Sequence, residues 1–303
     1  MLQAKIIADS SFEGERLTTF EVEFHRFILP ELNTHRVFSR NYQSSRAVPV
    51  KSLIEQVRDN PAIPVHWGKN QPGMVADKEL SGLDLDSAMS RWNGAAEDAA
   101  YHADLLNKDG AHKQIVNRLL EPFMWTRGVI TATEDGFNSF FKLRCHPAAQ
   151  PEIQALAYLM KDAFDASTPI ELKPGEWHLP YIEWNVDCDG QYFTGDDITT
   201  LEEAIKVSTS CVAQVSYRKL DDSVEKARKI YDMLNLPAKG LFSKNPPHFS
   251  PAEHCAMALA DDIAIDMFSD GYSESDIGGN FQSAGFYQYR KMLERGFENH
   301  FIG

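Results

Sequence analysis

A strand pattern that runs directly into an arginine-rich segment constrains the fold of this chain most. Apolar residues alternate with polar ones, as in a strand with one buried face, at Phe20, Val22 and Phe24. Pro30 then favours the start of a helix that carries His35 and Arg36 on its first turns, and the serine- and arginine-rich part after it is expected to loop out. The arginine-rich segment, residues 34–46, therefore begins near the end of a strand.

Residues 34–46 contain the side chains that capture phosphate groups, namely three arginines, a histidine, an asparagine and three serines. Guanidinium groups offer paired donors that match phosphate oxygens, and the shorter side chains add directional hydrogen bonds around them. A nucleotide is therefore the first ligand to consider. Composition alone fits a solvated turn held by salt bridges equally well.

A further arginine lies on an apolar helical stripe. Positions i, i+3, i+4 and i+7 of one helix face are occupied by Phe137, Phe140, Phe141 and Arg144. An arginine taken out of water needs an anionic or carbonyl partner, because an unpaired buried charge costs several kcal/mol. A bound nucleotide supplies such a partner. The alternative is that Arg144 extends into solvent at a helix C-terminus, where the helix dipole favours a cation.

The rest of the chain is expected to be mainly helical, with one long irregular segment. Proline and glycine residues mark 59–85 as irregular, either as a lid or as a plain surface insertion. Short strands or a hairpin are expected within 168–197. Helical periodicity predicts helices at 86–108, 112–121 and 200–235, and another that begins at Pro151 and buries Ile153, Leu156, Ala157, Met160 and Phe164.

The composition fits a cytoplasmic enzyme that folds as one large domain or as two. The 303 residues, 43% of them hydrophobic, are enough for a substantial core, and no apolar run approaches the roughly 18 residues of a membrane span or forms the core of a signal peptide. A net charge of −14 argues against broad nucleic-acid binding, although a local arginine cluster still suits a mononucleotide. Reduced, packed thiols without disulfide or zinc spacing are expected at Cys145, Cys188, Cys211 and Cys255.

The order of residues within 34–46 resembles the signature of the flavin-dependent thymidylate synthases. The matching positions are His35, Arg36, Ser39, Asn41, Ser44 and Arg46. Three positions depart from the usual signature: Thr34 replaces its first arginine, Tyr42 replaces a glutamate, and Ala47 replaces a tyrosine.

Two further blocks, each of two segments, extend the resemblance. Residues 140–144 and 149–153 resemble the later family segment that ends in Leu-Arg and continues with Ala-Gln-x-Glu-Ile. Residues 212–218 and 248–254 resemble blocks that precede the arginine signature in ordinary members. The chain is therefore identified as a circularly permuted, phage-like member of this family. The resemblance divides it into a signature segment at 16–46, an insertion or lid at 47–112, a helical nucleotide-binding part at 113–165 and a permuted flavin-binding segment at 205–260.

The resemblance implies the fold and the reaction. The family fold is α/β (α+β), with a mixed sheet and a substantial helical portion, here in permuted order. The implied reaction is reductive methylation of dUMP to dTMP, with methylenetetrahydrofolate as the one-carbon donor and FAD, reduced by NADPH, as the hydride source. The family uses no cysteine nucleophile. It assembles as a homotetramer with shared active sites, without nucleic acid or membrane as partner.

The resemblance also implies roles for individual residues. Arg144 stabilises negative charge on the pyrimidine, and Ser44 contacts the nucleotide instead of attacking it. The expected substrate-binding residues are Arg46, Ser44, Arg118, Tyr42, Glu31 and Arg144. The expected cofactor-binding residues are His35, Arg36, Asn41, Ser216, His248, Ser250 and Glu253.

The departures from the signature leave other functions open. Changes at Glu31, Thr34 and Tyr42 alter the hydrogen-bond pattern of the pocket, which fits an enzyme that makes 5-methyl-dCMP or 5-hydroxymethyl-dUMP. A nucleotide- or flavin-binding module without turnover is the alternative from another class. No metal site is expected, because His248, Glu253 and His254 lack a further ligand at suitable spacing and are better explained as a hydrogen-bonded cluster.

Overall fold

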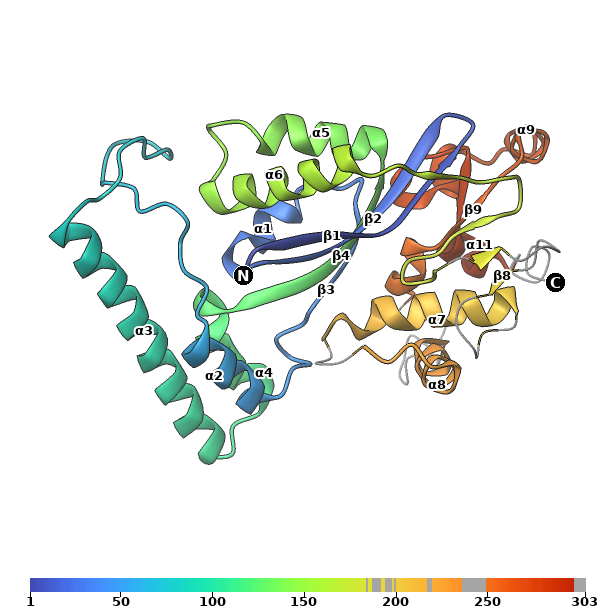
Figure 1. Ribbon diagram of the computed structural model, residues 1–303. Helices are drawn as coiled ribbons and strands as arrows, with labels where there is room; N and C mark the ends of the chain where they lie inside the picture. Colours follow the sequence, from blue (N-terminus) through green and yellow to red (C-terminus); the bar gives the residue numbers. More distant parts are fainter. Residues whose placement is uncertain are drawn as a thin grey trace.

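A five-stranded sheet forms the centre of the protein in this computed structural model (Figure 1). The structure describes residues 1–183, 185–186, 192–193, 198, 200–216, 220–235 and 249–296. The sheet is mixed, because β5 runs parallel to β1 and the other neighbours are antiparallel. In spatial order its strands are β3 (Ser39–Tyr42), β4 (Trp125–Thr133), β2 (Glu15–His25), β1 (Gln3–Phe12) and β5 (Ile170–Glu171). The predicted mixed-sheet α/β fold is confirmed.

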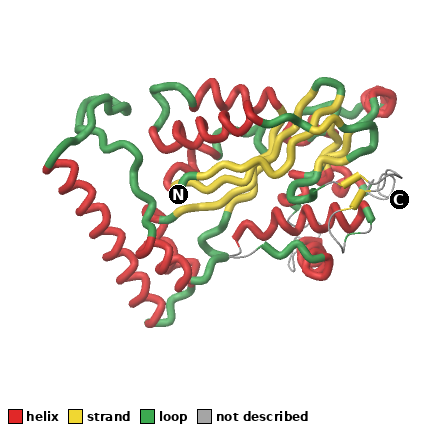
Figure 2. Tube along the Cα trace, viewed as in Figure 1, coloured by secondary structure: helices red, strands yellow, loops and turns green. Residues whose placement is uncertain are grey.

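Two helices cover one face of this sheet, α5 (Glu134–Arg144) and α6 (Pro151–Ala166) (Figures 1 and 2). The alternation predicted in β2 is confirmed, because Phe20, Val22 and Phe24 are buried on this face. The predicted buried face of α6 is confirmed as well. Pro151 occupies the first turn of α6, where a missing N–H costs no helical hydrogen bond. Together the strand and the two helices enclose one apolar core.

The C-terminal half packs against the opposite side of the sheet. Short strands and helices were both predicted here, and both are found. The strands are β6 (Trp177–His178), β9 (Ala256–Ala258) and β10 (Phe286–Gln288), which form a second sheet, and β7 (Asn185–Val186) and β8 (Tyr192–Phe193), which form a hairpin pair. The helices are α7 (Leu201–Ala213), η3 (Gln214–Ser216), α8 (Val224–Asn235), η4 (Ser250–His254), α9 (Asp261–Ser269), α10 (Glu274–Ile277), η5 (Gly279–Phe281) and α11 (Tyr289–Arg295).

A helical arm with a core of its own projects from the sheet, on the left of Figure 1. It consists of α2 (Val50–Asp59), α3 (Leu83–Lys108), α4 (Lys113–Val116) and η2 (Asn117–Phe123). The irregular segment predicted at 59–85 is found between α2 and α3. The single helix predicted at 112–121 is wrong in part, because only α4 is α-helical and the rest is a 3₁₀-helix that contains Pro122. No helix among the described residues is long and apolar enough to cross a membrane.

The arginine-rich segment differs from its predicted form. Helix α1 (Leu29–Leu32) follows the short η1 (Arg26–Ile28) and ends before His35, which lies in an irregular stretch between two turns. The predicted loop is wrong for Ser39–Tyr42, which form the strand β3 and pair with β4 from Ser39↔Thr131 to Tyr42↔Gly128, whereas Ser44, Ser45 and Arg46 lie in a loop and turn as predicted. Pairing with β4 satisfies backbone donors and acceptors that a loop at this buried position would leave unpaired.

Candidate functional site

The end of α5 places Arg144 against the turn that follows α1. Its Nε donates a hydrogen bond to Nε2 of His35 at 2.9 Å, and an Nη donates to Oγ1 of Thr34 at 3.1 Å. The same guanidinium lies 3.5 Å from the carbonyl oxygen of Glu31. The preceding turns of α5 are anchored by Phe137 and Phe140, which are fully buried. The predicted helix is confirmed, and Arg144 is half-buried against the signature segment.

The hydrogen-bond partners of Arg144 are neutral groups. Burial, and then the positive charges of Arg144 and Arg40, lower the pKa of His35 to about 4, so its imidazole is neutral near pH 7 and accepts the bond from Arg144. Among the described residues, Arg144 makes no ion pair with a carboxylate. Its charge is therefore available to an anionic or carbonyl ligand. Oε2 of Glu31 is buried nearby without a hydrogen-bond partner in the described part of the chain.

A second group of signature residues lies beside η2. Ser45 Oγ donates to Oε1 of Glu121 at 2.7 Å, and the same oxygen receives Arg118 at 2.7 Å and lies 3.6 Å from Arg26. Two guanidinium groups thus share one carboxylate. Arg46 is exposed and makes no hydrogen bond or ion pair with the described residues. This group has an excess of positive charge, as a phosphate site requires.

A third group joins β3 to the C-terminal half. Asn41 Nδ2 donates to the carbonyl oxygen of Val212 at 2.7 Å, so the end of α7 lies beside the signature segment, as the permutation predicts for this part of residues 205–260. Glu253 is buried, and its carboxylate oxygens accept hydrogen bonds from Arg290 and, at 3.2 Å, from Asn280. Burial raises the pKa of Glu253, whereas the charge and hydrogen bond of Arg290 lower it.

The other predicted site residues differ in their exposure and in their contacts. Arg36 is exposed and unpaired among the described residues, and Ser250 begins η4. The ring of Tyr42 lies 5.6 Å from that of Phe24, and its buried hydroxyl has no partner in the described part of the chain. Burial raises the pKa of Tyr42 far above its ordinary value. His248 and the side chain of Ser216 lie outside the described residues.

The structure thus places the described members of the predicted residues mainly in three groups. Within the described chain, no hydrogen bond or ion pair joins the Arg144 group to the group around Ser45 and Glu121. From sequence alone it stays open whether the residues near the C-terminus belong to a site, whereas in the structure three amide and guanidinium side chains contact Glu253: Asn280, Gln288 and Arg290. Only a pairing of distant segments reveals them, since no motif marks them in the sequence.

The contacts of Glu253 and His254 do not support a metal site at these two residues. His254 Nδ1 shares a hydrogen bond with Oγ1 of Thr131 at 2.7 Å, and Glu253 is held by Arg290. Among the described residues there is no group of three histidine, cysteine, aspartate or glutamate side chains that could hold a metal ion.

Two of the cysteines, Cys211 and Cys255, are poor nucleophiles. Cys211 and Cys255 are buried, which confirms that they are packed thiols. Burial raises the pKa of Cys211 to about 12 and that of Cys255 to about 11, so both are protonated near pH 7. Cys145 is half-buried, and Cys188 lies outside the described residues.

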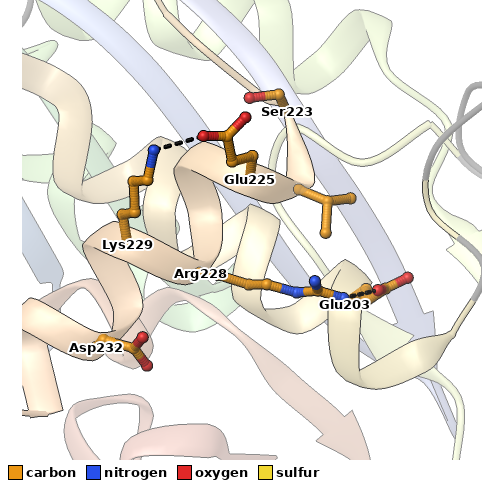
Figure 3. Close-up of a pocket in the computed structure, with 7 residues that line it drawn as sticks. Glu203, Ser223, Glu225, Arg228, Lys229 and Asp232 are labelled. Carbon is orange, nitrogen blue, oxygen red and sulfur yellow. Dashed lines mark hydrogen bonds and ion pairs between the residues drawn. The ribbon is translucent and has the colours of Figure 1, made fainter.

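A surface pocket of about 610 Å³ opens between α7 and α8 (Figure 3). Its lining is charged, and both of its cations are paired, Arg228 with Glu203 at 2.6 Å and Lys229 with Glu225 at 2.5 Å. No predicted site residue lines it; the lining residues are Glu203, Ser223, Val224, Glu225, Arg228, Lys229 and Asp232. The pocket therefore offers an anionic ligand no unpaired cation.

Comparison with known proteins gives a family match over more than half of the chain. Residues 10–170 match the model of the thymidylate synthase complementing proteins. No curated protein matches. The permuted segment 205–260 lies outside the matched residues, so the permutation stays a prediction.

Solved structures similar to this chain include the UMP/dUMP methylase PolB from Streptomyces cacaoi bound to 5-Br dUMP. It is 18% identical, with a TM-score of 0.45, and the match covers 54% of this chain and 90% of PolB. Thymidylate synthase X from Helicobacter pylori with FAD and dUMP is also 18% identical, with a TM-score of 0.35, and the match covers 49% of this chain and 67% of that one.

Proposed function

The chain belongs to the family of thymidylate synthase complementing proteins and is a pyrimidine nucleotide methyltransferase, and from this premise we propose that it methylates dUMP to dTMP in an FAD-dependent reaction. Methylenetetrahydrofolate provides the one-carbon unit and NADPH the reducing equivalents in this proposal. The three groups of signature residues take the nucleotide and the flavin.

The proposal depends mainly on the charge of Arg144, which no described carboxylate neutralises. Its guanidinium is half-buried and bonded to neutral acceptors, so its charge is not neutralised by the described chain. A pyrimidine that gains negative charge on a carbonyl oxygen during attack from C5 is stabilised by a donor already fixed in place. His35 orients this donor, because its neutral imidazole accepts from Nε of Arg144.

Arg46, Arg118 and Ser44 are the proposed phosphate ligands. Arg118 lies 2.7 Å from Glu121, which also receives Ser45, so the carboxylate holds this loop in place. Arg46 has no such partner among the described residues and remains available to an anion. A phosphate adds negative charge to a group with more cations than anions.

The described residues fit a flavin. Arg36 offers an exposed guanidinium that is unpaired among the described residues and is open to a polar ligand. Bound FAD supplies hydride chemistry that no side chain provides. The residues proposed to hold it are His35, Arg36, Asn41, Ser216, His248, Ser250 and Glu253.

A homotetramer with shared sites belongs to this proposal. Its support is that no hydrogen bond or ion pair of the described residues joins the Arg144 group to the group around Ser45 and Glu121, so a neighbouring subunit could complete each site with the other group. Arg46 and Arg144 would then act on one nucleotide from different chains.

A second candidate reaction gives another 5-substituted pyrimidine, 5-methyl-dCMP or 5-hydroxymethyl-dUMP. The buried carboxyl oxygen of Glu31 favours the dCMP product of this pair, because a carboxylate accepts from the amino group of cytosine, whereas uracil has a carbonyl oxygen at that position. Thr34 supports it too, since its hydroxyl accepts from Arg144 where the family signature has an arginine. A nucleotide-binding module without turnover is the third candidate.

Mass spectrometry of the product nucleotide tests these candidates. The purified protein is incubated with FAD, NADPH and methylenetetrahydrofolate, in parallel with dUMP and with dCMP. We expect a methyl gain on dUMP alone. A methyl gain on dCMP, or a hydroxymethyl gain on either, would establish the second candidate, and no product from either would favour the binding module.

A further inference from the structure

The C-terminal segment surrounds Glu253, a proposed flavin-site residue, with three side chains. Both carboxylate oxygens are occupied, Oε1 by Nη1 of Arg290 and Oε2 by Nδ2 of Asn280 at 3.2 Å. Nε2 of Gln288 donates to the carbonyl oxygen of Glu253 at 3.1 Å and lies 3.3 Å from Oγ of Ser39 on β3. The C-terminal segment therefore contacts both Glu253 and strand β3 of the signature segment.

The fold brings this segment to Glu253 by strand pairing. β10 pairs antiparallel with β9, with Gln288 opposite Ala256, so α11 starts directly beside η4. The N–H of Tyr289 donates to the carbonyl oxygen of Cys255 at 2.9 Å and holds this start in place. Gly279 has φ +58°, and a Cβ there would lie 2.2 Å from Oε1 of Gln288, so only glycine fits.

We propose that Arg290 is a positioning residue of the flavin site, which holds the Glu253 carboxylate as an oriented anion and thereby sets the affinity for flavin. This inference rests on the proposed function, in which Glu253 contacts the cofactor. Arg290 lies outside the residues that match the family model, and the proposed site had no role for it. It acts through Glu253 and has a second partner in Glu294, at 2.9 Å on its own helix.

The charged groups around Glu253 explain why Arg290 has the strongest effect in keeping its carboxylate ionised. The charged groups that reach it from the described elements are Arg290 and Glu294 on α11 and Arg40 on β3, whereas η5 and β10 present the neutral amides of Asn280 and Gln288. From α7, Ser208 and Thr209 bond Cys255 next to it and carry no charge. Burial opposes the carboxylate, and Arg290 is the largest opposing influence. Without Arg290, the pKa of Glu253 rises.

The test is FAD affinity as a function of pH, measured by quenching of flavin fluorescence from pH 5.5 to 8.5. For Arg290→Ala we expect at least a tenfold weaker affinity at pH 7, with partial recovery at higher pH as Glu253 ionises. Glu253→Gln should bind weakly at every pH, and the double variant should match it, because no titrating carboxylate remains. Arg290→Lys keeps the charge but not the fixed fork of donors, and we expect an intermediate affinity.

Arg295→Ala is the matched control. Arg295 lies on the same helix, bonds Asp276 at 2.7 Å and does not contact Glu253. We expect it to lower thermal stability without changing FAD affinity or its pH dependence. An Arg290→Ala protein that binds FAD like Arg295→Ala at every pH would overturn the inference and leave the proposed function intact. If Arg290→Ala fails to fold, Arg290→Lys decides by the same comparison. A wild-type protein that binds no FAD would overturn the proposed function and this inference together.

Discussion

Arg144 and His35 form a pair in which burial decides the charge of one partner. A protonated imidazole next to a guanidinium would repel it, whereas the pKa of about 4 keeps His35 neutral and leaves Nε2 as an acceptor. The arginine is thereby oriented without loss of its charge. Such an arrangement suits stabilisation of charge that appears only during reaction, because the donor needs no reorganisation.

At the residue scale, we predict that Arg144→Ala abolishes turnover while flavin stays bound. Loss of one fixed donor to a developing negative charge typically costs about 10²–10³ in kcat. Turnover is followed by dTMP formation, and bound flavin by absorbance after gel filtration. Lys142→Ala, an exposed change in the same last turn, is the control and should keep wild-type turnover. Wild-type turnover in Arg144→Ala would remove the role assigned to Arg144.

Strand β3 holds the signature by close packing against β4. Tyr42 lies over Gly128, and a Cβ at that glycine would approach Cδ1 of the tyrosine ring to 2.3 Å. The glycine therefore allows the two strands to pair with an aromatic ring between them and the core. This packing, more than the polar chemistry of the signature, explains a strand where a loop was predicted.

At the element scale, we predict that Gly128→Ala destabilises the protein by about 1–3 kcal/mol, because Tyr42 must move out of its site. The free energy of unfolding in urea measures this effect. Gly94→Ala on α3 is the control, since a Cβ there meets open space. Alanine in a helix interior is favoured over glycine by roughly 1 kcal/mol, so this control should stabilise the protein. Equal effects of the two substitutions would contradict the packing argument.

The layers of the whole molecule are joined by a buried chain of hydrogen bonds. His178 lies 2.9 Å from Oγ of Ser10 and 2.8 Å from Oγ1 of Thr19. Thr19 lies 2.7 Å from Oγ1 of Thr131, which bonds His254 at 2.7 Å. Burial lowers the pKa of His178 to about 4 and that of His254 to about 3. Both imidazoles are therefore neutral in the folded protein near pH 7.

At the scale of the whole molecule, we predict a loss of stability as the pH falls from about 6.5 to about 4. In this window the unfolded chain binds protons on histidine that the folded chain does not, so acid favours unfolding. The lowered pKa of His178 corresponds to roughly 3 kcal/mol. The free energy of unfolding is measured at several pH values in wild type and in His178→Gln, which should show a shallower dependence. His102→Gln, an exposed change on α3, should leave the slope unaltered.

The tetramer with shared sites predicts complementation between inactive variants. Arg46→Ala and Arg144→Ala should each be inactive alone, and mixed oligomers of the two chains should regain part of the activity. Such sites receive the intact Arg46 from one chain and the intact Arg144 from another. Light scattering measures the mass of the oligomer, and dTMP formation measures the activity. A monomer, or mixed oligomers as inactive as their parents, would contradict the shared-site proposal.

Local patterns in the sequence determined several secondary-structure elements and the family signature. The alternation in β2 and the apolar stripes of α5 and α6 depend on neighbouring residues, and the structure confirms all three. The family signature is similarly local, and the family match supports it over residues 10–170. The expected roles of the signature residues and the single-domain organisation remain predictions.

Only the tertiary structure decided how the signature is divided and what encloses it. Ser39 lies on a strand because it pairs with β4, which lies about ninety residues further along the chain. Gln288 meets Ser39 across a sequence separation of 249 residues, and Arg290 meets Glu253 through the pairing of β10 with β9. Local periodicity contains no information on such partners, because the free energy of a long-range contact depends on the packing of every element between them.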